Sequence, residues 1–104
     1  MESRREQAIA YFKEGYNCAQ SVALAHADLL SITKEQAAVL TQSFGGGMGR
    51  LRQVCGAVSG MFFVASALTG SSEPKDVDGK KKNYETVQQL AAAFEKRNGS
   101  IICA

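Results

Sequence analysis

Apolar residues recur every three or four positions along almost the whole chain, which is the period of an α-helix. The alternating pattern of a half-buried β-strand is absent, and Pro74 is the only proline. The pattern therefore predicts an all-α fold, a single compact bundle of about five helices. The expected helices cover residues 3–14, 18–30, 33–43, 54–69 and 80–97.

Polar caps and glycines mark the ends of these helices. A helix begins well after a Ser, Thr or Asn cap, and better still when Glu or Gln follows three positions later; it ends readily at glycine. The residues that predict starts are Ser3 with Glu6, Asn17, and Thr33 with Gln36, and those that predict ends are Gly15 and Gly99. Cys18 is then expected in the first turn of the second helix.

The same spacing predicts which side chains face inward. The inward residues are expected to be Ala8, Ile9 and Phe12; Cys18, Val22, Ala25 and Leu29; Ala37, Leu40 and Phe44; and Tyr84, Val87, Ala91 and Phe94. Helix 54–69 is apolar nearly all round, so we expect it in the middle of the bundle. Gly56 and Gly60 allow neighbouring backbones to come close to it.

Residues 45–49, Gly-Gly-Gly-Met-Gly, are too rich in glycine to stay helical. The simplest interpretation is a tight reversal that packs closely around Cys55. A cradle for an anion is the alternative, because the segment leads into a helix start. It follows a helix rather than a strand, however, and lacks the Gly-Lys-Ser/Thr of a phosphate-binding loop, so nucleotide binding is poorly supported.

The composition is that of an ordinary globular protein, with 45% hydrophobic and 21% charged residues among 104. The net charge of +2 comes from mixed signs spread along the chain, which indicates no nucleic-acid partner. The charged start is followed by no apolar leader, and the longest apolar stretch, 54–68, is interrupted by glycine and serine. We therefore expect no membrane insertion and a cytoplasmic location.

Three cysteines carry the candidate chemistry. In a cytoplasmic protein, paired thiols more often serve redox or metal chemistry than structural disulfides. Cys18 and Cys55 both fall at expected helix starts, where the helix dipole favours a thiolate, and Arg50 and Arg52 lie close to Cys55 in sequence. Cys55 is the better nucleophile, although three buried, inert cysteines would give the same pattern.

Three sequence motifs resemble the C-GCAxxG-C-C family of redox-active proteins. They are Tyr-Asn-Cys-Ala-Gln at 16–20, Phe-Gly-Gly-Gly-Met-Gly-Arg at 44–50, and Val-Cys-Gly-Ala-Val-Ser-Gly at 54–60, which holds the CGAxxG core. The resemblance implies a helical fold, redox activity, and Cys18, Cys55 and Cys103 as the first three of four family cysteines. The fourth has no counterpart, so we expect a single domain over 1–104 that is truncated at its C-terminus or works with fewer thiols.

The resulting hypothesis gathers Cys18, Cys55 and Cys103 at the start of the central helix. No C-x-x-C is present, so the fold must bring these distant residues together. Cys55 would be the reactive thiol of a thiol-disulfide oxidoreductase, with Cys18 or Cys103 resolving the mixed disulfide formed with an unidentified redox partner.

Two alternatives stay open beside this hypothesis. In the first, the three cysteines hold zinc or an iron–sulfur cluster. In the second, the chain is a non-enzymatic helical interaction module. The apolar residues 101–103 at the end of the chain also make a homodimer an expectation.

Overall fold

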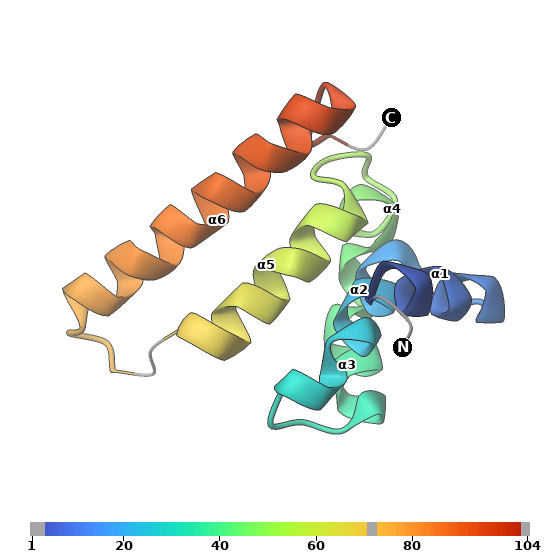
Figure 1. Cartoon of the computed structure of the whole chain (residues 1–104), viewed down its shortest axis with the longest axis horizontal. Helices are drawn as coiled ribbons and strands as arrows, with labels where there is room; N and C mark the ends of the chain where they lie inside the picture. The colour runs from blue at the N-terminus through green and yellow to red at the C-terminus, as the bar shows by residue number, and fades with distance from the viewer. Residues whose placement is uncertain (1–3, 71–72, 103–104) are drawn as a thin grey trace.

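The computed structural model describes residues 4–70 and 73–102, and it is all-α in that part of the chain (Figure 1). The helices are α1 (Arg4–Glu14), α2 (Cys18–Ala25), α3 (Lys34–Thr41), α4 (Gly45–Met48), α5 (Gly56–Thr69) and α6 (Val77–Asn98), with single 3-10 turns at Ala27–Leu29 and Gln42–Phe44. The predicted fold class is confirmed.

Local hydrogen bonds at the helix starts confirm the predicted caps. The Asn17 side chain accepts from the Gln20 amide at 2.9 Å, while the Asn17 amide donates to the Gln20 side chain at 3.0 Å. Thr33 and Gln36 form the same reciprocal pair at 3.1 and 2.9 Å. These capping boxes place the first residue of α2 at Cys18. Ser3 lies outside the described residues.

The second helix is shorter than predicted, ending at Ala25 rather than near Leu30. The Arg4 guanidinium donates to the Ala25 carbonyl at 2.7 Å, and the Leu29 amide bonds to the His26 carbonyl instead of continuing the α-helical pattern. An arginine from α1 thus binds the last carbonyl of α2, just before the 3-10 turn begins.

Helix α5, which the sequence predicts in the middle of the bundle, lies between α2 and α6. It packs on α2 along one side and on α6 along another, while α1 and α3 pack on α2 (Figure 1). Helices α5 and α6 run side by side as a long hairpin. The buried apolar residues are mostly small: Ala19, Ala23, Leu24, Ala25, Ala27, Ala37, Val58, Val64 and Ala65.

Several side chains predicted to face inward are exposed, and the prediction is wrong for them: Ile9, Phe12, Leu29, Leu40 and Tyr84. Helix α1 instead turns Arg4 and Tyr11 toward α2 and α3, where Arg4 forms hydrogen bonds and Tyr11 packs on the buried cluster of Ala23, Leu24 and Ala37. Small residues make the contacts of α3, which leaves Leu40 outside.

The glycine-rich segment forms a left-handed turn. Residues Gly46, Gly47, Met48, Gly49 and Arg50 all have φ between 59° and 75°, a conformation that glycine adopts most easily. The segment folds back on itself, since the Gln53 amide donates to the Gly47 carbonyl at 2.9 Å. This agrees with the interpretation as a tight reversal.

Among the helices of 4–70 and 73–102, none combines the length and apolar character needed to cross a bilayer.

Candidate thiol site

Cys18 and Cys55 both stand at the start of a helix, as the sequence predicts. Cys18 is the first residue of α2, directly after the Asn17 cap, and Cys55 is the N-cap residue of α5. Both thiols are half-buried. The first turn of a helix presents backbone N–H groups and the positive end of the helix dipole.

Gly56 brings these two helix starts together. A Cβ placed on Gly56 would lie 3.1 Å from the Cys18 Cβ and 3.2 Å from the Ala19 amide nitrogen, so the backbone next to Cys55 touches Cys18 directly. One turn later, a Cβ on Gly60 would lie 2.9 Å from the Ala19 carbonyl oxygen. The two glycines of the CGAxxG core therefore form the surface of α5 on which α2 packs.

The end of the chain also reaches this site. The Cys55 amide donates to the Ile101 carbonyl at 2.7 Å, and Val54 and Ile102 form an isolated antiparallel β-bridge. The described residues 101 and 102 of the apolar tail therefore pair with residues 54 and 55 of the same chain.

Cys103, the third predicted thiol, lies outside the described residues. Cys18 lies against Gly56, the residue that follows Cys55, and no disulfide joins the two cysteines in the structure. Within 4–70 and 73–102, no three His, Cys, Asp or Glu side chains are grouped closely enough to hold a metal ion. The site that can be described is the junction of α2 and α5, with Cys18 and Cys55 at the two helix starts.

Asn17 forms contacts beyond those expected of a helix cap. Its side-chain amide also donates to the Gln42 carbonyl at 2.9 Å, and a side chain on Gly45 would collide with it. Gln20 donates to the Ala38 carbonyl at 2.9 Å. The start of α2 is thereby tied to α3 and to the glycine turn. The capping pattern in the sequence indicated the local bonds, but gave no signal for these distant acceptors.

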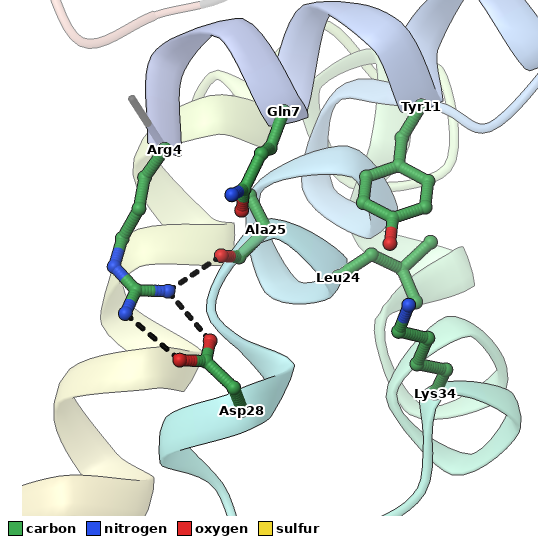
Figure 2. Close-up of a pocket in the computed structure, with 7 residues that line it drawn as sticks. All are labelled: Arg4, Gln7, Tyr11, Leu24, Ala25, Asp28 and Lys34. Atoms are coloured by element: carbon green, nitrogen blue, oxygen red, sulfur yellow. Dashed lines mark hydrogen bonds and ion pairs between the residues drawn. The ribbon is translucent and has the colours of Figure 1, made fainter. Parts of the chain in front are cut away.

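A separate pocket of about 430 Å³ lies at the other end of α2, beside Leu24 and Ala25 (Figure 2). Arg4 and Asp28 form an ion pair at its edge, at 2.6 and 3.0 Å. Lys34 reaches over the Tyr11 ring, 5.7 Å from its centre. Cys18 and this pocket are separated by the length of α2, so the pocket is no part of the thiol site.

Comparison with known proteins agrees with the motifs. A family model described as "Putative redox-active protein (C_GCAxxG_C_C)" matches residues 16–104, which include both described cysteines and all but one residue of the region after α1. No curated protein and no solved structure matches the chain significantly.

Proposed function

This chain belongs to the C_GCAxxG_C_C family, and we propose that it performs redox chemistry by thiol–disulfide exchange between Cys55, Cys18 and a disulfide substrate. The observation that supports this most directly is the contact of Gly56 with Cys18, because it places the two helix-start cysteines at one junction of α2 and α5. Such exchange needs one attacking thiolate and a second thiol near it.

Cys55 is the proposed attacking group. It is the N-cap residue of the long apolar helix α5, while Cys18 begins the shorter helix α2. Its backbone is held on both sides: the amide is bound to Ile101, and the carbonyl accepts the Val58 and Ser59 amides at 3.0 Å each. A thiol on a fixed backbone at a helix start is well placed to react repeatedly in one orientation.

The exchange balances in two steps. The Cys55 thiolate attacks one sulfur of the substrate disulfide, forming a mixed disulfide and releasing the other sulfur as a thiolate. The Cys18 thiolate then attacks the Cys55 sulfur, which releases the second substrate thiolate and leaves a Cys18–Cys55 disulfide. Two electrons pass from the protein thiols to the substrate, and an external dithiol returns the protein to its reduced form.

Cys103 is the alternative resolving thiol. It follows Ile102, which is bridged to Val54. The choice between Cys18 and Cys103 can be made by experiment, because each predicts a different protein disulfide after the substrate is released.

The test is the reaction of the reduced protein with glutathione disulfide, followed by mass spectrometry. The wild type should release glutathione and gain an internal disulfide. Cys18→Ser should instead stop as a mixed disulfide between glutathione and Cys55, because the resolving thiol is gone. Cys55→Ser should react slowly throughout.

Cys103→Ser is the matched control, since it removes a thiol but leaves the Cys18 and Cys55 pair intact. If Cys103→Ser, rather than Cys18→Ser, accumulates the mixed disulfide, Cys103 is the resolving thiol. If Cys55→Ser reacts as fast as the wild type, the proposed role of Cys55 is wrong.

A further inference from the structure

The surface of the chain is larger than a monomer of its mass normally exposes. Its accessible surface is 7122 Å², whereas the scaling for monomeric proteins gives about 5,700 Å² at 11.1 kDa, a surplus of about 1,400 Å². A stable two-protein interface buries about 800 Å² on each partner, so the surplus is large enough for one.

Helix α6 is one of the elements that leave their surface uncovered. None of the 22 residues of α6 is fully buried, because α5 is the main neighbour of the helix and covers one side of it (Figure 1). The half-buried residues facing α5 include Val87, Leu90 and Phe94. The rest of its surface has no partner among the described residues that buries it.

Next to the covered side, α6 carries a second apolar stripe. Val77 and Tyr84 are 71% and 59% exposed, and Ala91 continues the line at the same interval of seven residues. In a helix that packs on another helix, residues seven positions apart lie on one line. Val87 and Phe94 form a second such line beside the first, and the two lines together have the spacing of the apolar positions in a heptad repeat. A shallow hollow beside Val77 and Tyr84 follows the stripe.

Polar residues on the outer edge of the stripe also recur every seven residues: Lys81, Gln88 and Glu95, all exposed. The order of these residues along α6 is complementary to the same order read in the opposite direction. When a second α6 lies antiparallel with its Gln88 opposite Gln88, Lys81 of each copy faces the partner's Glu95. Tyr84 of each copy then faces the three-alanine stretch 91–93, so a large side chain meets small ones.

We propose that a second copy of this chain docks on α6, antiparallel, about a two-fold axis near Gln88. The two α5–α6 hairpins then form a four-helix arrangement in which Val87 and Phe94 lie between the helices. Opposite charges at flanking positions of paired helices select both the partner and the orientation. A parallel pairing would place Lys81 against the partner's Lys81 and Glu95 against the partner's Glu95.

The test is sedimentation equilibrium over a concentration series, with a reductant present so that disulfides contribute nothing. The wild type should form a dimer. Lys81→Glu and Glu95→Lys should each weaken it about tenfold in Kd, because two attractive pairs in every dimer become repulsive. The double variant Lys81→Glu with Glu95→Lys should regain the wild-type Kd, because each pair is again attractive with its two charges exchanged.

Lys82→Glu is the control, because it makes the same charge change on the opposite side of α6 and should leave Kd unchanged. Circular dichroism checks that every variant keeps its helices. A monomer at all concentrations would overturn the proposal, and so would a dimer that is insensitive to both single changes or is not restored by the double change.

Discussion

Arg4 joins α1 to the end of α2 by three hydrogen bonds, two to the Asp28 carboxylate and one to the Ala25 carbonyl (Figure 2). A bidentate pair of this kind fixes the direction of both side chains. An apolar pattern places arginine on the outside of a helix, so the sequence predicted Ile9 and Phe12 on the inner face. In the structure, the inner face of α1 begins at Arg4, because the hydrogen bonds of its guanidinium compensate for placing a charge on that face.

The Arg4–Asp28 pair makes a prediction about pH. Hydrogen bonding from Arg4, followed by its charge, holds the pKa of Asp28 below the usual value of 3.8. Because the folded pKa is depressed, the pair stabilises the fold above the unfolded pKa, and this contribution is lost as pH falls through the folded value. Arg4→Gln should raise the Asp28 pKa toward 3.8, measured by NMR of the carboxyl carbon.

Lys13→Gln is the control for the Asp28 titration, since it removes a positive charge from the other end of α1. A titration curve for Asp28 that is the same in Arg4→Gln and in the wild type would show that the pair does not form in solution.

At the scale of elements, the contact of α2 with α5 depends on the absence of side chains. Gly56 and Gly60 are one turn apart and present bare backbone to Cys18 and Ala19. The caps at Asn17 and Thr33 were predictable because they involve only nearby residues. The inward faces of α1 and α3 were not, since they depend on which distant residues supply hydrogen bonds and on how closely small side chains let the helices approach.

Gly60→Ala tests this contact. Alanine normally favours a helix by about 1 kcal/mol over glycine, but here its Cβ would lie 2.9 Å from the Ala19 carbonyl oxygen, a backbone atom that cannot rotate away. We expect a net loss of about 1–2 kcal/mol in the free energy of unfolding, measured with urea. Ser66→Ala, at an exposed position of α5, should cause little change. A more stable Gly60→Ala would contradict the close approach.

At the scale of the whole molecule, the core is small and made mainly of alanine. The main cluster of buried residues contains only Ala23, Leu24 and Ala37, with Tyr11 and Phe63 among the partly buried residues around it. Few large side chains are buried, so each should contribute strongly. The five helices other than α4, and their order, could be predicted from the sequence, but the small size of this core could not, because apolar residues such as Leu40 were expected to join it.

Leu24→Ala should therefore lower the free energy of unfolding by about 2–4 kcal/mol, the cost of removing a buried leucine and leaving a cavity. The matched variant Leu40→Ala removes the same atoms from an exposed position and should change the free energy by less than about 0.5 kcal/mol. Urea unfolding measures both. Equal losses would mean that α3 faces the core with Leu40, against the structure.

The thiol site combines what the sequence could and could not predict. Both helix-start positions followed from local signals, the Asn17 cap before Cys18 and the glycine turn before Cys55. That the two helix starts approach each other through Gly56 was expected only from the requirement of the chemistry and from the family resemblance. The pairing of Ile101 with Cys55 had no sequence signal at all, because a single backbone bridge leaves no periodic pattern.

The central claim is that Cys18 and Cys55 form a reversible pair. Equilibration of Cys103→Ser in mixtures of reduced and oxidised dithiothreitol, with alkylation and peptide mapping at each ratio, tests it most directly. We predict one two-electron transition that yields a peptide linked through Cys18 and Cys55 and is fully reversed by reductant. Two thiols that remain separately alkylated at every ratio, or that link only between different molecules, would contradict the account.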